Sequence, residues 1–174
     1  MLKKIVIAAV AVAALGSNGA FAAGASTVSV TGTSLGVNAT VVPSCSVGST
    51  TAVAFGNITV IPGATGAGSF TVTCDLNTDY AVGLGNGNAF AVTRNMTSGG
   101  NTLPYELFVD NTYATRFNNV AIGDTVGGVP ASGTVGGTGS GSSVSFNVYG
   151  QIPLTATKPA PGYYQDSVAI TVIY

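Results

Sequence analysis

The sequence contains no histidine and no tryptophan, and charged residues make up only 6% of its 174 positions. Without histidine, neither a Ser-His-Asp triad nor a Cys-His pair can form. Five Lys and Arg residues stand against six Asp and Glu residues, so we expect no nucleic-acid partner, since that requires clustered basic side chains. The missing tryptophan also disfavours an antibody-type domain, which typically packs one against its disulfide.

Carboxylates are too scattered to indicate a catalytic pair. Glu106 and Asp75 occupy polar positions of apolar strands, so we expect both to face solvent. Three other acids lie in turn-forming surroundings: Asp79, Asp110 and Asp124. Asp166 precedes the last apolar segment, where a short acid can accept hydrogen bonds from turn amides. We therefore expect no enzymatic activity and no cofactor.

The first 22 residues are typical of an export signal. Lys3 and Lys4 precede an apolar run at 5–15, and the small-x-small site at 20–22 predicts a mature chain that starts at Ala23. A membrane anchor is the alternative, although eleven apolar residues are short for a bilayer span. Export predicts an oxidising environment for the two cysteines, Cys45 and Cys74, and hence one disulfide. A metal site is the other reading, but two thiols without histidine make a poor ligand set.

Glycine-rich turns and short alternating segments predict an all-β fold. Residues 69–76 alternate most clearly, with Phe70, Val72, Cys74 and Leu76 expected on the buried face. Six or seven such segments favour a two-sheet sandwich. The other expected strands lie at 27–41, 51–60, 80–84, 103–109, 144–148 and 166–174.

Residues 123–143 are rich in glycine and poor in apolar side chains. This composition predicts a flexible surface connection rather than a strand. An exposed contact surface in an assembly is the alternative. Residues 166–174 differ from the glycine-rich stretch because apolar side chains occupy both faces of the expected strand. This pattern predicts a buried strand that needs a partner.

Several short motifs, in order, cover nearly the whole mature chain. Together they resemble the spore coat protein U family, the subunits of archaic (Csu-type) chaperone–usher pili. The matching segments are VVPSCSV at 41–47, FG at 55–56, FTVTC at 70–74, RNM at 94–96, LPYEL at 103–107, YGQIP at 149–153 and GYYQDSVAITV at 162–172.

The resemblance implies an immunoglobulin-like sandwich, formed by residues 35–174, that lacks its last strand. A periplasmic chaperone would first fill the gap, and at the outer-membrane usher the N-terminal extension of another subunit would replace it. We expect this extension at residues 23–34, with donor side chains at Val28, Val30, Leu35 and Val37, the last two bordering the first core strand. The acceptor groove would be walled by Val168, Ile170, Val172 and Tyr174.

The expected role is therefore a surface-exposed pilus subunit that polymerises head to tail and serves attachment and biofilm formation. Two alternatives remain. One is a spore-coat or surface-layer protein with a complete sandwich. The other is a carbohydrate-binding adhesin module, for which Tyr113, Tyr163 and Tyr164 are the candidate aromatic residues.

Overall fold

The computed structural model describes residues 34–87, 93–120, 125–126 and 129–174, and the chain divides into two units, 1–39 and 40–174. The described residues form antiparallel strands without a helix, so the all-β prediction is confirmed. The described part of the chain therefore contains no helix that could cross a membrane. The predicted signal at 1–22 lies outside the described residues.

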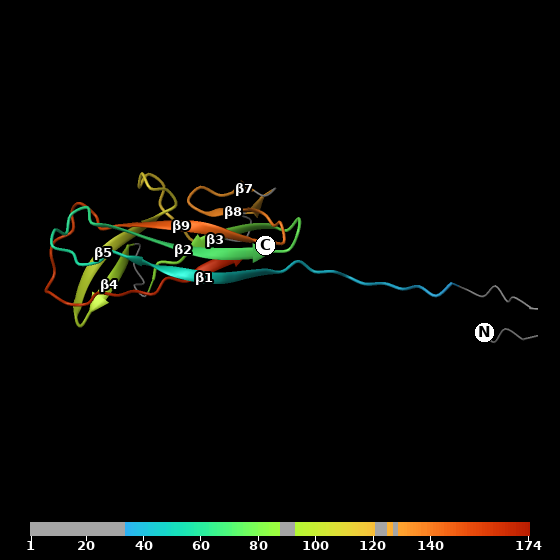
Figure 1. Ribbon diagram of the computed structural model, residues 1–174, viewed down its shortest axis with the longest axis horizontal. Helices are drawn as coiled ribbons and strands as arrows, with labels where there is room; N and C mark the ends of the chain where they lie inside the picture. Colours follow the sequence, from blue (N-terminus) through green and yellow to red (C-terminus); the bar gives the residue numbers. More distant parts are fainter. Residues whose placement is uncertain (1–33, 88–92, 121–124, 127–128) are drawn as a thin grey trace, which may run out of the picture. The chain divides into compact units, whose positions relative to one another are not determined.

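The larger sheet of the second unit has five antiparallel strands in the order β1-β2-β9-β5-β4 (Figure 1). The pairing of β2 with β9 is the longest regular register, from Thr65 opposite Gln151 to Thr73 opposite Ser143. The five strands are β1 (Cys45–Ala54), β2 (Thr65–Cys74), β9 (Ser143–Gln151), β5 (Asn101–Phe108) and β4 (Arg94–Ser98).

The smaller sheet has three strands in the order β10-β3-β8, and a separate two-stranded ladder joins β6 to β7. Ile170 to Ile173 pair with Leu84 to Ala81, which places β10 beside β3. The strands are β3 (Asp79–Leu84), β8 (Val135–Thr138), β10 (Ile170–Ile173), β6 (Thr125–Val126) and β7 (Val129–Pro130).

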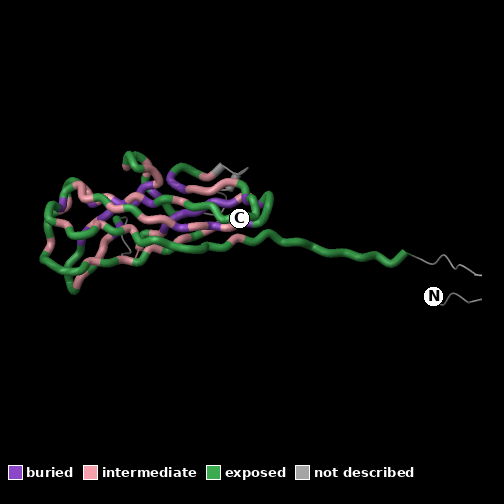
Figure 2. Tube along the Cα trace, in the orientation of Figure 1, coloured by how far each residue is buried: buried purple, intermediate pink, exposed green. Residues whose placement is uncertain are grey.

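The core lies between the two sheets, as expected for a sandwich (Figure 2). Phe70 of β2, Val82 of β3 and Leu107 of β5 are buried in one cluster. A smaller second cluster of Ile61, Leu103 and Ile152 lies where the loop after β1 meets the loop after β9. The first cluster includes Phe70, Val72 and Cys74, because every second side chain of β2 points to the same face of the sheet.

Several expectations about the strands are wrong, and two of them concern β8 and the end of β2. Residues 135–138, within the glycine-rich stretch, form β8 and pair with β3. Gly136 allows this pairing because its φ is +153° and a Cβ there would lie 2.2 Å from the carbonyl oxygen of Tyr80. Leu76, expected on the buried face, is mostly exposed because β2 ends at Cys74.

The predicted disulfide is present between Cys45 and Cys74. These residues are direct cross-strand partners at the start of β1 and the end of β2. The bridge therefore ties neighbouring strands of one sheet and fixes where β1 begins. The predicted first strand at 27–41 does not extend into this sheet, since residues 34–44 form no strand.

Candidate functional site: an apolar groove between two sheet edges

Two edge strands, β1 and β10, lie near each other on the same side of the sandwich. β1 ends the order of the larger sheet and β10 ends that of the smaller one, so each is paired on one side only among the described strands. An unpaired edge presents backbone N–H and C=O groups that can template another strand. The space between these edges is the candidate site.

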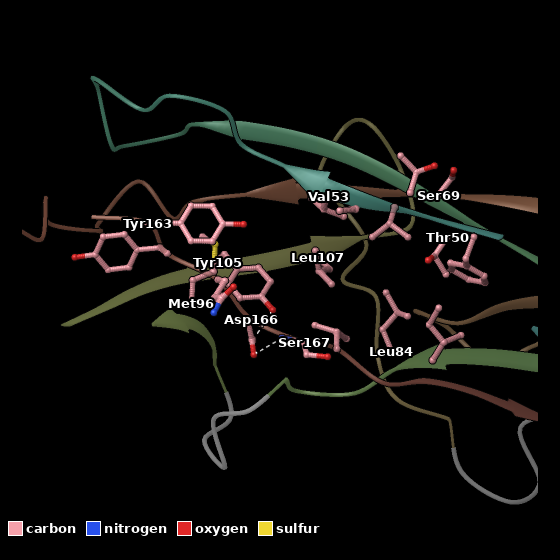
Figure 3. Close-up of a pocket in the computed structure, with 18 residues that line it drawn as sticks. Thr50, Val53, Ser69, Leu84, Met96, Tyr105, Leu107, Tyr163, Asp166 and Ser167 are labelled. Carbon is pink, nitrogen blue, oxygen red and sulfur yellow. Dashed lines mark hydrogen bonds between the residues drawn. The ribbon is translucent and has the colours of Figure 1, made fainter. Parts of the chain in front are cut away.

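A cavity of about 360 Å³ lies between the two edges (Figure 3). Val53 of β1 stands on one wall and Leu84 on the other, with Leu107 between them. Its floor is the apolar core itself, including Phe70 and Val148. An extended segment that buried alternate side chains here would find main-chain partners and an apolar surface together.

The cavity continues into a second one of about 660 Å³, which shares Val53, Met96 and Tyr164 with the first. Because they share these lining residues, the two cavities form one groove. Along it, residues 50–58 of one wall face residues 158–170 of the other. Residues 50–53 lie in the same cavity as residues 163–170, and residues 52–58 in the same cavity as residues 158–164. Residue numbers therefore rise along one wall while they fall along the other, so β1 and β10 run in opposite directions along the groove.

Glycines bring the β1 wall over the inner face of its own sheet. The β1–β2 register shifts twice, after Val47 and after Thr51, so β1 carries bulges. A Cβ at Gly68 would lie 2.5 Å from the carbonyl oxygen of Thr51. At Gly150 it would lie 2.7 Å from the side chains of Val53 and Phe55. Only glycine at these positions lets β1 cross closely enough to turn Val53 toward the groove.

A partly buried hydrogen bond holds the opposite wall. The Tyr105 hydroxyl donates to Asp166 Oδ2 at 2.7 Å, and the Ser167 amide donates to Asp166 Oδ1 at 2.7 Å. This matches the expectation that Asp166 fixes the approach to the last strand. Burial, followed by the hydrogen bond to the Asp166 carboxylate, raises the pKa of Tyr105 far above its usual range.

A buried ion cluster lies beside this wall. Arg94 donates to the carbonyl oxygens of Leu84 and Phe117 at 2.8 and 2.7 Å, and to that of Gly85 at 2.8 Å. Its Nη1 also lies 4.0 Å from Glu106 Oε2. Burial lowers the pKa of Arg94 by desolvation, against the opposing effects of Tyr105 and Glu106.

The expectation that Glu106 faces solvent is wrong. Its carboxylate is buried, and Oε1 lies 3.4 Å from Arg116 Nη1 without a hydrogen bond of normal geometry. The alternation of β5 is broken because Glu106, Leu107 and Phe108 are all buried. Strand parity alone could not reveal this, because it predicts one exposed face, whereas Arg94 of β4 and Arg116, in a segment hydrogen-bonded beside the end of β5, both lie next to the Glu106 carboxylate.

Of the four predicted acceptor residues, Val168 and Ile170 line the groove, whereas Val172 and Tyr174 do not. Val168, Ile170 and Val172 are half-buried and pack against the core cluster. Tyr174 is more than half exposed, and β10 begins only at Ile170, so the expected strand at 166–174 is shorter than predicted. Their role as an acceptor surface stays a prediction.

Two of the predicted donor residues, Val28 and Val30, lie outside the described residues. Leu35 and Val37 are 89% and 86% exposed and belong to no strand. Val41, which the donor prediction did not include, is 92% exposed. The sequence does carry a signal for Val41, because apolar residues continue at every second position from Leu35 to Val41.

The candidate aromatic residues of the carbohydrate-binding alternative do not gather on one surface. Tyr113 packs edge-on against Phe108 in the turn after β5, where its φ is +57°. The Tyr164 hydroxyl donates to the carbonyl oxygen of Ala160 at 2.7 Å, and its ring packs against the second cluster. Tyr163 remains largely exposed.

Of the three acids predicted in turns, Asp110 lies in one, Asp79 is instead the first residue of β3 and accepts a hydrogen bond from the Thr138 hydroxyl, and Asp124 lies outside the described residues. Asp110 accepts hydrogen bonds from the Thr112, Ala114 and Thr115 amides and from the Thr112 hydroxyl. These bonds, the hydroxyl first, lower the pKa of Asp110 well below its usual range. Across the described residues, no group of three His, Cys, Asp or Glu side chains is placed to hold a metal ion.

Comparison with known proteins gives one family and a similar solved structure. The model of the Spore Coat Protein U domain matches residues 31–171. A similar solved structure is the crystal structure of the CsuC–CsuE chaperone–tip adhesion subunit pre-assembly complex from archaic chaperone–usher Csu pili of Acinetobacter baumannii. It is 20% identical with a TM-score of 0.49, and the match covers 78% of this chain and 41% of that one. No curated protein matches the chain.

Proposed function

Because the chain belongs to the Spore Coat Protein U domain family, we propose that it is a structural, non-enzymatic subunit of an archaic chaperone–usher pilus. It is exported through the periplasm to the cell surface, where the filament serves attachment and biofilm formation. Subunits join by donor-strand exchange: an N-terminal segment of one copy fills the groove of another. Such a contact does not close on itself, so it propagates into a filament.

One observation carries this proposal: an apolar groove lies open between two strand edges. The complete-sandwich alternative predicts a strand in this groove, and the described residues place none there. A strand added between β1 and β10 would satisfy edge backbone groups and cover the half-buried side chains of Val168 and Ile170. Burial of each further Val or Leu side chain contributes about 1.5–3 kcal/mol.

The donor segment of the proposal is extended from residues 23–34 to include 35–41. Leu35, Val37, Ala39 and Val41 share one parity, and the three larger ones are almost fully exposed. The other parity carries Gly36, Asn38 and Thr40, which suit a solvent-facing side. This alternation is what a strand needs to place one face in an apolar groove.

Before assembly the groove needs a temporary occupant, because exposed apolar edges favour aggregation. A periplasmic chaperone supplies that occupant in the proposal, and the outer-membrane usher exchanges it for the donor segment. The Cys45–Cys74 disulfide fixes the start of the β1 wall in the oxidising periplasm.

The test replaces donor side chains and keeps the folded domain intact. Leu35→Arg with Val37→Arg should abolish polymers when the chain is co-expressed with its chaperone and usher, because a charge cannot enter the apolar groove without a large desolvation cost. Asn38→Arg is the matched control, since its side chain has the opposite parity and should leave polymers unchanged. Polymer length is read by size-exclusion chromatography and electron microscopy.

A second arm locates the acceptor. Ile170→Asp should reduce polymer formation and chaperone binding together, since both occupants would use the same groove. Normal polymers from the Leu35→Arg, Val37→Arg variant would contradict the donor role of this segment. Normal chaperone binding by the Ile170→Asp variant would contradict the groove as the shared site.

A further inference from the structure

The segment that follows β3 contains Asn86 and Gly87, which form the only Asn-Gly pair of the chain after position 22. In such a pair the main-chain nitrogen of the glycine can attack the side-chain carbonyl carbon of the asparagine, because glycine has no side chain that shields its nitrogen. Asparagine is for this reason one of the thermolabile residues of proteins. Asn57 shows the contrast, since the bulky Ile58 follows it. We therefore expect chemical change at Asn86 before Asn57.

The fold exposes Asn86 and requires glycine after it. Asn86 is exposed, so its carboxamide has room to turn toward the main chain. Gly87 has a φ of +74°, a conformation that residues with a side chain rarely adopt. A Cβ at this position would also overlap the carboxylate of Asp166. Backbone and packing thus both demand glycine at 87, and they place its unshielded nitrogen directly after an accessible asparagine.

Residue 86 lies between two points that hold the β10 wall of the groove. On one side, the Gly85 amide donates to the carbonyl oxygen of Ala169 at 2.9 Å, and the Gly85 carbonyl oxygen accepts from Arg94 Nε at 2.8 Å. On the other side, Gly87 packs against Asp166, which precedes β10. A change in charge or in main-chain length at residue 86 therefore acts on both points at once.

We propose that Asn86 is a site of spontaneous deamidation and that the product loosens the β10 wall. This inference goes beyond the proposed function and does not rest on it. The Gly87 nitrogen bonds to Asn86 Cγ and gives up its proton, the bond from Cγ to Nδ2 breaks, and ammonia leaves with that proton. Water then opens the resulting succinimide. Opening at Cγ yields aspartate, whereas opening at the main-chain carbonyl carbon yields isoaspartate, in which the main chain runs through Cγ.

Both products disturb the wall. Aspartate places a second carboxylate next to Gly87 and hence close to Asp166, and two like charges at this separation repel each other. Isoaspartate inserts an additional methylene into the main chain between Gly85 and Gly87. The bonds that Gly85 makes and the contact of Gly87 with Asp166 then no longer fit the same spacing, so the approach to β10 is released.

The test ages the exported chain in mildly alkaline buffer and maps its asparagines by mass spectrometry, with isoaspartate scored enzymatically. The product at Asn86 should form at least several-fold faster than at Asn57 and Asn111, two exposed asparagines that serve as internal controls in every sample. The rate should rise with pH, because the attacking nitrogen must lose its proton. With only five basic and six acidic residues in the sequence, the added charge is also resolved by isoelectric focusing.

Two variants separate the chemistry from its effect on the wall. Asn86→Gln keeps the carboxamide but requires a larger ring for the same attack, so it should remain unmodified. Asn86→Asp reproduces one product. It should unfold at lower urea concentration than the parent chain and show faster hydrogen exchange at the Gly85 amide. Asn57→Asp is the matched control, since it adds the same charge on an exposed loop.

The aged parent chain gives a second measurement that needs no substitution at the site. It should unfold at lower urea concentration than the Asn86→Gln chain aged in the same way. Modification of Asn86 no faster than that of Asn57 overturns the deamidation site. Equal urea midpoints for the aged parent and the aged Asn86→Gln chain, or equal shifts from Asn86→Asp and Asn57→Asp, overturn the effect on the wall. None of these results bears on the donor-strand proposal.

Discussion

The two sheets of the domain are joined by polar side chains in one region and stand open in another. Around Arg94 and Tyr105, side chains of the larger sheet reach the carbonyl oxygen of Leu84 in β3 and the carboxylate of Asp166 before β10. Between β1 and β10, no described strand or side-chain hydrogen bond crosses the gap, and an apolar groove remains.

This difference teaches how an incomplete sandwich keeps its gap from collapsing. A purely apolar seam has no preferred geometry and would close to bury its surface. Hydrogen bonds are directional, so Tyr105 holds the approach to β10 through Asp166, and Arg94 holds the end of the neighbouring β3, each at a set distance from the larger sheet. The buried charges thus act on geometry, and the groove stays ready for an extended segment.

The largest expected effect comes from breaking the polar region. Arg94→Met removes the positive charge next to Glu106 and leaves three carbonyl oxygens without their donor. Removing one partner of a buried pair costs about 3–5 kcal/mol. Urea unfolding of the chaperone-free domain should show a loss of this size, and the mutant should accumulate poorly.

Arg116→Met is the control for this prediction. Arg116 also pairs with Glu106, but its side chain is largely exposed. Exposed ion pairs contribute at most about 1 kcal/mol. Equal losses from both variants would contradict the assignment of Arg94 as the residue that fixes the wall.

The open region has its own covalent tie, and breaking it ranks second. Cys45→Ser with Cys74→Ser should lower the free energy of unfolding by about 3–4 kcal/mol for a loop of this length, and loosen the start of β1. Hydrogen exchange should increase most in β1 and little near Arg94. Normal accumulation of the double variant with its chaperone would show that the bridge matters less than its position suggests.

The sequence predicted the open region better than the polar one. The alternation of β2, the apolar segment of β10 and the cysteine pair were visible from spacing, because each depends on local periodicity or on compartment. The burial of Glu106 was not, since its neighbours include Arg116, which comes from a segment after β5 that returns to hydrogen-bond beside the end of that strand. A contact between distant residues leaves no mark in strand parity.

The positions where close packing requires glycine were also not visible in the sequence. Residues 135–138 looked like a connection because they include two glycines, yet Gly136 is what lets β8 approach Tyr80. The groove itself depends on Gly68 and Gly150, which the sequence shows only as turn-like residues. Composition can indicate glycine-rich loops, but only the pairing partner shows when glycine serves close packing.

Filling the groove should stabilise the domain and reduce the contrast between the two regions. A peptide of residues 34–42 is added to the full chain that carries Leu35→Arg and Val37→Arg, which cannot donate its own segment. At a free concentration of 100 times its Kd, the peptide raises the free energy of unfolding by about 2.7 kcal/mol. A peptide with its apolar residues moved to the other parity is the control, and equal stabilisation by both would contradict a strand-like mode of binding.

The smallest expected effect concerns the hydrogen bond that joins the polar region to the groove. Tyr105→Phe removes the donor to Asp166 and keeps the ring that contacts Phe55. A hydrogen bond to a charged group contributes about 1.5–3 kcal/mol, and the half-buried position of Asp166 favours the lower figure. Chaperone binding should weaken along with stability, because the variant frees the β10 wall, whereas Tyr164→Phe should change neither by a comparable amount.

The pH dependence of the same variant separates the hydrogen bond from simple packing. The pKa of Tyr105 is raised in the folded state, so above about pH 10 the unfolded chain loses a proton that the folded chain retains. Stability of the parent chain therefore falls as pH rises through 10, with a slope of up to about 1.4 kcal/mol per pH unit for this one group. Burial raises the pKa of Tyr80 as well and adds a slope of the same sign. Tyr105→Phe should remove its own share of the slope, so an unchanged alkaline slope in urea unfolding would show that Tyr105 is not protected in the folded domain.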